Sequence, residues 1–144
     1  MKNDGLIRVS VSFFCHDGKG NYLIHKRSKN ARDEQERWDN GGGGLKFGET
    51  IEQALHREIQ EEYCVSVIKA EFAGYRDVLR EQNGVQTHWV TIDFKVEVDR
   101  ESVKIGEPHK CEALKWVTLD ELENFSEPLH SQLPKFLEKI KSMS

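Results

Sequence analysis

The stretch that most constrains the fold is residues 41–65, GGGGLKFGETIEQALHREIQEEYCV, in which four glycines precede a helix-forming pattern. Thr50 is a good helix N-cap and Gln53 completes a capping box, so we expect a helix over residues 50–63. Three apolar side chains fall on one face of that helix: Ala54, Leu55 and Ile59. A helix with one apolar face must pack on another layer, so this stretch predicts a layered domain.

Two glutamates of this helix lie inside its apolar arc rather than on its polar face. With about 100° per residue, Glu58 falls at about 340° and Glu62 at about 20°, while Arg57 and Glu61 lie at the edge of the arc. A desolvated carboxylate is costly unless it gains a proton or a positive partner. Mg²⁺ or Mn²⁺ would satisfy both carboxylates. A solvated, glutamate-rich face is the alternative, and spacing alone leaves both interpretations open.

The glycines favour the metal-binding interpretation. Glycine lets the backbone approach a ligand closely, and the free N–H groups at the start of a helix suit a phosphate. A phosphate-binding loop beside a cluster of carboxylates is what metal-assisted attack on a phosphoanhydride requires. The stretch therefore indicates an enzyme that cleaves such a bond.

In the order and spacing of their residues, positions 43–65 resemble the Nudix box, G-x5-E-x7-R-E-U-x-E-E-x-G-U, where U is a bulky aliphatic residue. The matching positions are Gly43, Glu49, Arg57, Glu58, Ile59, Glu61, Glu62 and Val65. Two positions depart from the family pattern. Cys64 replaces the last glycine of the box, which puts the end of the helix in question. The proline of the upstream W-x-x-P-G-G pattern is missing after Trp38.

The resemblance implies an α/β fold, a Nudix-type α/β/α sandwich with a mixed central sheet, and one Nudix hydrolase domain over residues 1–144. It also implies hydrolysis of a nucleoside diphosphate linked to another group, with Mg²⁺ as cofactor and Mn²⁺ as an alternative. The rest of the chain suits such a fold, because alternating segments predict several strands. We expect strands at residues 6–15, 22–24, 65–79, 87–98 and 114–117, a turn at 82–84, a short helix from Thr118 and a helix over about 129–140.

The resemblance further implies roles for individual residues. The implied metal ligands are Glu58, Glu61, Glu62, the backbone of Gly43 and a further acid, for which Glu112 is the first choice and Glu107 the second. The implied catalytic residues are Glu61, Glu58, Arg57 and Glu49, of which Glu49 orients Arg57. We expect the substrate to lie against Gly42, Gly43, Gly44 and Trp89. Three further side chains could contact a base, although packing is their ordinary role: Trp38, Tyr75 and His88.

Two later segments, residues 87–98 and 107–117, resemble the MutT-like nucleoside triphosphate diphosphatases. Residues 66–107 lack the proline that many Nudix ADP-ribose hydrolases carry, and no tyrosine follows Tyr75 as it does in many dinucleoside-polyphosphate hydrolases. We therefore expect hydrolysis of a (d)NTP to a (d)NMP and pyrophosphate. The alternatives are an ADP-ribose or nucleotide-sugar diphosphatase and, from another class, an inactive Nudix domain that senses a nucleotide.

Composition argues against several other functions. The net charge is -4 and no block of lysine and arginine stands out, so we expect a small-molecule nucleotide as partner and no stable binding of nucleic acid. No apolar run approaches the ~20 residues that span a bilayer, and no secretory signal is visible, so we expect no membrane contact and a cytoplasmic location. The three cysteines suggest reduced thiols. A homodimer is an open alternative to a monomer.

Overall fold

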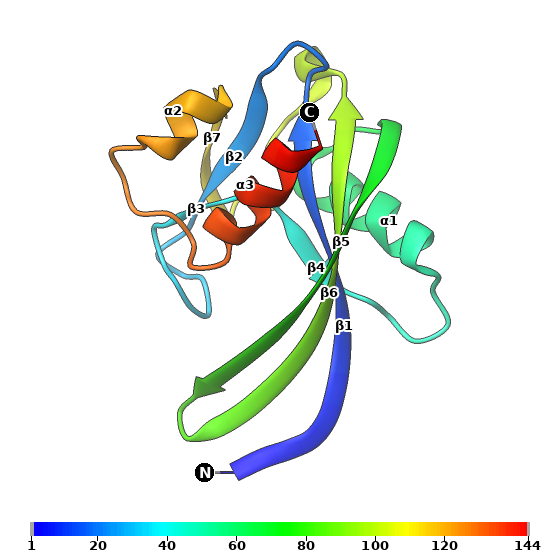
Figure 1. Cartoon of the computed structure of the whole chain (residues 1–144), viewed down its shortest axis with the longest axis vertical. Helices are drawn as coiled ribbons and strands as arrows, with labels where there is room; N and C mark the ends of the chain where they lie inside the picture. The colour runs from blue at the N-terminus through cyan, green and yellow to red at the C-terminus, as the bar shows by residue number, and fades with distance from the viewer. Residues whose placement is uncertain (1, 144) are drawn as a thin grey trace.

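A seven-stranded mixed sheet forms the centre of the computed structural model, which describes residues 2–143 (Figure 1). The strands are β1 (Lys2–His16), β2 (Tyr22–Arg27), β3 (Trp38–Asp39), β4 (Gly42–Gly44), β5 (Val67–Gln82), β6 (Val85–Val98) and β7 (Cys111–Val117). The helices are α1 (Ile51–Tyr63), the 3-10 turn η1 (Arg100–Ser102), α2 (Leu119–Glu123) and α3 (Leu133–Ser142). None of the helices within these residues is long and apolar enough to cross a membrane.

The strand order is β3-β2-β1-β6-β5, with β4 also paired to β1 and β7 to β2. The long strands β1 and β6 run parallel, in a register that continues from Ile7 opposite His88 to His16 opposite Glu97. The other pairs are antiparallel, among them the long hairpin of β5 and β6. The sheet is therefore mixed, as the sequence predicts.

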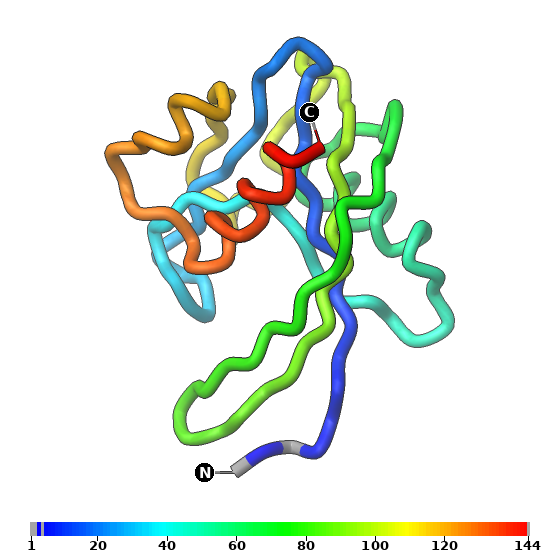
Figure 2. The backbone as a smooth tube through the Cα atoms, viewed as in Figure 1, coloured from blue at the N-terminus to red at the C-terminus, as the bar shows by residue number. Residues whose placement is uncertain are grey.

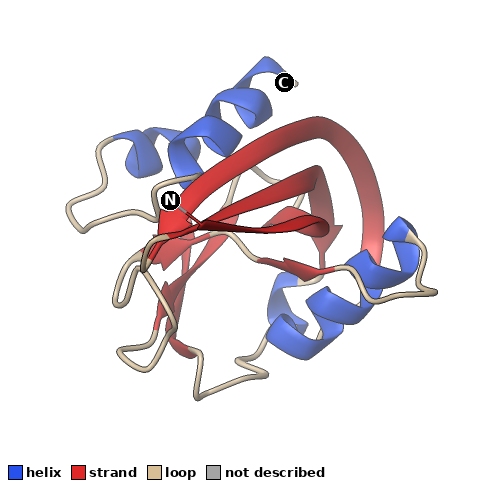
Figure 3. Cartoon of the chain, turned by 90° about the horizontal axis from the view of Figure 1, so that it is seen from below, coloured by secondary structure: helices blue, strands red, loops and turns tan. Residues whose placement is uncertain are grey.

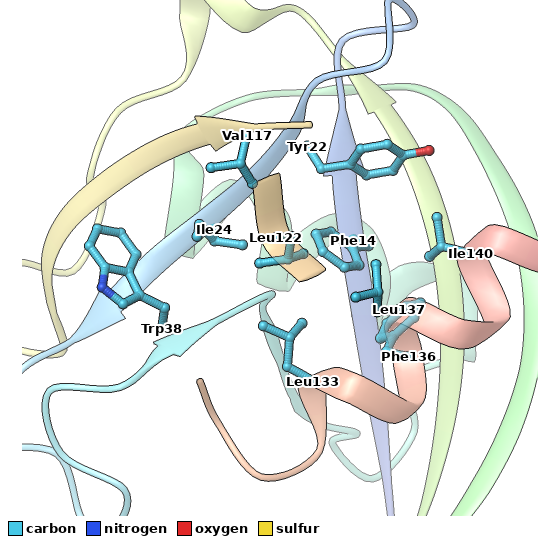
Figure 4. Close-up of a cluster of buried hydrophobic side chains, with 10 residues drawn as sticks. All are labelled: Phe14, Tyr22, Ile24, Trp38, Val117, Leu122, Leu133, Phe136, Leu137 and Ile140. Carbon is cyan, nitrogen blue, oxygen red and sulfur yellow. The ribbon is translucent and has the colours of Figure 1, made fainter. Parts of the chain in front are cut away.

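Helices cover both faces of the sheet, which gives the predicted α/β/α sandwich (Figure 3). Alternation along β1 supplies both cores, because Phe13 and Cys15 pack with the residues of α1 while Phe14 packs on the opposite side. The core opposite α1 is drawn in Figure 4. Its residues are Phe14, Tyr22, Ile24, Trp38, Val117, Leu122, Leu133, Phe136, Leu137 and Ile140.

Helix α1 begins and ends as the sequence predicts. Thr50 accepts a hydrogen bond from the Gln53 N–H, and the Gln53 side chain bonds back to the Thr50 N–H, which completes the capping box. At the other end Cys64 adopts the left-handed conformation, with φ 55°, and its N–H donates to the Gln60 carbonyl at 3.0 Å. A side chain in this conformation costs on the order of 1 kcal/mol relative to glycine. The exchange of glycine for cysteine therefore keeps the geometry of the helix end.

Other boundaries differ from the expected ones. Helix α3 begins at Leu133 rather than near residue 129, because the preceding residues pair with Trp38 instead. The Trp38 N–H donates to the Pro128 carbonyl at 3.0 Å, and the His130 N–H donates to the Trp38 carbonyl at 2.8 Å. Strand β5 begins two residues later than expected and continues to the turn. Strand β2 continues beyond Ile24 to Arg27, and β7 begins earlier, at Cys111.

The first half of β1 and the hairpin end of β5 and β6 extend beyond the helices (Figures 1 and 2). We call this three-stranded extension, residues 2–9, 75–82 and 85–92, the arm. Its register places Ile7 and Leu79 opposite His88 on one face, the face that α1 covers further along the sheet. The other face of the arm carries the alternate residues, among them Arg8 and Trp89.

Candidate active site

Arg57 lies at the centre of a network of charged side chains on α1. Its Nε and Nη2 atoms donate to the two carboxylate oxygens of Glu49 at 2.6 and 2.9 Å. Its Nη1 donates to Glu58 at 2.7 Å and to Glu61 at 3.3 Å, and Nη2 also donates to the Gly44 carbonyl at 3.1 Å. The planar guanidinium suits such two-pronged contacts. Arg57 thereby ties the loop before the helix and β4 to two of the predicted metal ligands.

The contact between Arg57 and Glu49 fixes the charge of both groups. Hydrogen bonds from the Arg57 guanidinium lower the pKa of the Glu49 carboxyl to about 2. The same hydrogen bonds raise the pKa of Arg57 above its usual value. Both groups therefore stay charged throughout the physiological pH range, and the structure brings them together as the sequence predicts.

Glu58 and Glu62 lie on the side of α1 that faces β4. Gly43 packs so closely on Glu58 that an added Cβ would overlap its carboxylate, and the Gly42 N–H donates to Glu62 at 3.4 Å. Desolvation, followed by the neighbouring Glu58 carboxylate, raises the pKa of Glu62 well above its usual value. Burial and the neighbouring carboxylate therefore both disfavour the charged form of Glu62.

Within residues 2–143 the structure converges no three Asp, Glu, His or Cys side chains on a point where one metal ion could contact them all. Two of the three helix glutamates, Glu58 and Glu61, contact the Arg57 guanidinium instead. The donors nevertheless fit a hard divalent cation. Three carboxylates and the backbone of Gly43 offer oxygen atoms, and Glu58 and Glu62 lie beside each other against β4.

The three glutamates open into a cavity of about 670 Å³, which we call the acidic cavity. The loop after η1 brings a fourth glutamate, Glu107, to its wall. In this loop the Lys104 N–H donates to the Tyr63 carbonyl at 3.0 Å and the Gly106 N–H to the Glu62 carbonyl at 2.9 Å. These contacts satisfy carbonyls that the end of a helix otherwise leaves free. Glu107 adds to the rise in the pKa of Glu62, after burial and Glu58.

The two candidates for the additional metal ligand are placed differently. The Glu112 carboxylate accepts a hydrogen bond from the Lys29 N–H at 3.1 Å, and Glu112 does not line the acidic cavity. Glu107 does line that cavity. The geometry therefore favours Glu107, the second choice from the sequence, over Glu112.

A buried chain of hydrogen bonds connects α1 to the glycine-rich segment. The Tyr63 hydroxyl donates to the Asn40 carbonyl at 2.5 Å and lies 2.7 Å from the Nδ1 atom of His25. Since that hydroxyl donates to Asn40, it accepts a hydrogen bond from the Nδ1–H of His25. Burial lowers the pKa of His25. This chain fixes residue 40 against the helix, and so fixes where the following glycines lie.

A second cavity, of about 800 Å³, lies on the face of the sheet opposite α1, and we call it the sheet cavity. Trp89 lines it, and an added Cβ on Gly44 would lie 3.6 Å from the Trp89 ring. The other candidate base contacts lie elsewhere. Trp38 is buried in the core, Tyr75 is exposed on the opposite face of the sheet, and His88 pairs with Asp77 at 2.9 Å.

The acidic cavity and the sheet cavity share one wall. Gly42, Gly43 and Gly44 line both, as do Arg32 and Asp33 from the loop between β2 and β3. The sequence predicts the three glycines and Trp89 as substrate contacts, and the structure gathers all four around the sheet cavity. The sequence does not identify Arg32 or His25 as site residues. No spacing rule connects a residue of a polar loop or of a strand to a site on a distant helix.

Known proteins resemble the chain over nearly its whole length. A family model described as the NUDIX domain matches residues 6–140. A MutT NUDIX hydrolase from Burkholderia pseudomallei is 27% identical with a TM-score of 0.81, over 94% of this chain and 98% of that one. A MutT protein from Methanosarcina mazei Go1 is 24% identical with a TM-score of 0.74, over 97% and 96% of the two chains. The NUDIX domain of Shewanella oneidensis NrtR, solved with ADP ribose, is 18% identical with a TM-score of 0.73, over 96% and 87%.

Proposed function

The chain belongs to the Nudix family of hydrolases, which act on nucleoside diphosphate derivatives, and within that family we propose that it hydrolyses a (d)NTP to a (d)NMP and pyrophosphate. One observation carries this proposal. The acidic cavity, suited to a metal-bound phosphoanhydride, shares the wall of Gly42–Gly44 with a cavity large enough for a nucleoside. The resemblance of residues 87–98 and 107–117 to the MutT-like nucleoside triphosphate diphosphatases supports a nucleoside triphosphate as substrate.

We assign the chemistry to the residues around Arg57. Glu58, Glu61 and Glu62, with the backbone of Gly43, would hold Mg²⁺, and we add Glu107 in place of Glu112. When bound, Mg²⁺ neutralises charge on the phosphate oxygens and leaving group. Glu61, whose side chain is 43% exposed, is the most accessible of the three helix glutamates and accepts the proton of the attacking water. Glu49 and Arg57 hold the helix glutamates in position.

A panel of nucleotides tests the substrate. It contains the dNTPs, oxidised dNTPs, ADP-ribose, nucleotide sugars and dinucleoside polyphosphates, each with Mg²⁺ and with Mn²⁺. We expect the dNTPs to give the highest kcat/KM and to release pyrophosphate rather than phosphate. ADP-ribose or a nucleotide sugar as the preferred substrate would establish the second candidate, which the size of the sheet cavity also permits. Binding without turnover of any nucleotide would indicate a sensor domain.

Removal of divalent metal is expected to abolish the activity. The carboxylates of α1 repel a phosphate unless a bound cation lies between them. The residual rate with excess EDTA should therefore be that of the uncatalysed reaction. Adding Mg²⁺ beyond the chelator should restore the rate, as measured by pyrophosphate release. Activity that survives rigorous chelation would point to different chemistry.

We also propose that the chain forms a homodimer through the arm and the adjoining Phe72 of β5. Four apolar side chains are exposed on the α1 side of β1 and β5: Ile7 (67%), Phe72 (65%), Tyr75 (64%) and Leu79 (71%). Together they expose on the order of 500 Å² if each offers about 200 Å² when free. This approaches the ~800 Å² that each partner contributes to a standard interface. Asp77 and His88 on this face pair with each other at 2.9 Å, which reduces the charge that two copies would bring together across a two-fold axis.

Leu79→Asp is expected to convert a dimer into a monomer, because two copies would then bury like charges against each other. Sedimentation velocity over a range of protein concentrations measures the change. Lys135→Asp, on an exposed position of α3, is the control and should remain dimeric. A wild-type protein that sediments as a monomer at about 100 μM, well above the μM dissociation constants of weak specific dimers, would refute the interface.

A further inference from the structure

We propose that Arg32 holds the phosphate chain of the substrate where it passes from the acidic cavity to the sheet cavity. This inference rests on the proposed function. Arg32 lies in the loop between β2 and β3 and lines both cavities. A nucleotide with its anhydride beside the glutamates and its base beside Trp89 must cross the shared wall of Gly42–Gly44. Arg32 is the cation on that wall.

The guanidinium of Arg32 is available to a ligand. Among residues 2–143 no hydrogen bond or ion pair joins Arg32 to another side chain or to the backbone. The other arginines and lysines of the two cavity walls are engaged: Arg27 with Asp33, Lys110 with Glu107, Arg76 with Asp93, Arg80 with Glu34, and Arg8 over the ring of Trp89. Arg32 thus differs from the other basic side chains of the two cavity walls, each of which has a protein partner. We take this difference to indicate a ligand contact.

The loop that carries Arg32 is fixed by its next two residues. Asp33 pairs with Arg27 of β2 at 2.7 Å and with Arg80 of β5 at 3.5 Å. Glu34 accepts a hydrogen bond from Arg80 at 2.9 Å. Two strands therefore hold the loop in place. Asp33 also lines the wall that the two cavities share, and these contacts neutralise its charge. The backbone that carries Arg32 is therefore set before a substrate arrives, and only the exposed side chain has to be ordered on binding.

The positive charge of Arg32 can offset the repulsion between the glutamates and the phosphates of a nucleotide. Four glutamates line the acidic cavity besides the ion-paired Asp33, and they repel the phosphates of an approaching nucleotide. A guanidinium at the entrance to the sheet cavity offsets this repulsion, and its planar fork can donate two hydrogen bonds to one phosphate. A lysine at the same position would keep the charge but lose the two-pronged contact.

The test compares three variants with the wild-type protein. Arg32→Ala should lower kcat/KM for the best nucleotide of the panel roughly ten- to hundredfold, the range expected for a hydrogen bond to a charged group. Arg32→Lys should recover part of the loss. Arg37→Ala is the matched control, because Arg37 lies in the same loop, contacts Glu34 and the Leu129 carbonyl, and lines neither cavity. It should stay within about twofold of wild type, the scale on which surface substitutions act.

A binding measurement separates this inference from the proposed function. Isothermal titration with inorganic pyrophosphate in EDTA reports anion binding without turnover, and Arg32→Ala should weaken it about tenfold or more. Weaker pyrophosphate binding in a protein that hydrolyses no nucleotide would support Arg32 and reject the function. An active enzyme in which Arg32→Ala behaves as Arg37→Ala would reject Arg32 and keep the function. A wild-type protein that neither hydrolyses nucleotides nor binds pyrophosphate would reject both.

Discussion

Glu62→Gln is expected to lower kcat by at least about a hundredfold with the fold intact, since metal-assisted charge stabilisation supplies several kcal/mol. The amide keeps the size of the side chain but removes one negative charge from the group that we propose holds Mg²⁺. Desolvation and Glu58 already raise the pKa of Glu62, so a neutral side chain also relieves repulsion in the metal-free protein. We therefore expect no fall in the melting temperature. Pyrophosphate release and thermal unfolding measure the two effects.

A second readout and a control make this result specific. Glu61→Gln should act in the same direction, whereas Glu52→Gln, on an exposed position of the same helix, should keep the wild-type rate. Mg²⁺ should raise the melting temperature of the wild-type protein and of Glu52→Gln, because a ligand that binds only the folded state stabilises it. The rise should be smaller in Glu62→Gln. Wild-type turnover by Glu62→Gln with Mg²⁺ would show that the metal assignment is wrong.

Gly43→Ala is expected to reduce kcat about a hundredfold, the loss that a shift of about 1 Å in a reacting group can cause. An added Cβ would overlap the carboxylate of Glu58, which is the end of a flexible side chain and can move away. Its movement breaks the 2.7 Å contact with Arg57 and displaces one of the proposed metal ligands. Steady-state kinetics with Mg²⁺ measures the loss, and circular dichroism checks that the fold remains.

The neighbouring glycine provides the comparison for Gly43. A Cβ on Gly44 would lie 3.6 Å from the Trp89 ring, which is ordinary van der Waals contact. Gly44→Ala should therefore change KM by a few-fold through the sheet cavity and leave kcat close to wild type. An equal loss of kcat in both variants would mean that the segment tolerates no side chain, and that the contact with Glu58 is not the cause.

Helix α1 could be predicted from the sequence because its determinants are local. The capping box of Thr50 and Gln53 sets its start, and helical phase alone places Glu58 and Glu62 on the inner side. The contact between Glu49 and Arg57 also follows from positions that the family pattern fixes. Local signals were therefore sufficient to predict the helix and most of the side chains that it contributes to the site.

The remaining features of the site depend on contacts between distant parts of the chain. Glu107 reaches the acidic cavity because Gly106 packs on the end of α1, where an added Cβ would overlap the Glu61 carbonyl. A glycine in a loop gives no sign of such a contact in the sequence. Arg32 likewise takes its position from Arg80, which belongs to a strand far along the chain. Sequence spacing cannot report either arrangement, since both require the folded sheet.

The parallel pairing of β1 and β6 also determines when the active-site helix can become stable during synthesis. The hydroxyls of Ser10 and Thr91, 81 residues apart, meet at 2.8 Å across the two strands, and Val96 of β6 completes the core on which α1 packs. On a ribosome that adds about 5–20 residues per second, α1 therefore emerges a few seconds before its core is complete. During that interval the apolar face of α1 can pack on Phe13, Cys15 and Leu23, but it lacks Val96 and Val98 of β6. The acidic cavity is completed later still, because Glu107 follows β6 in the chain.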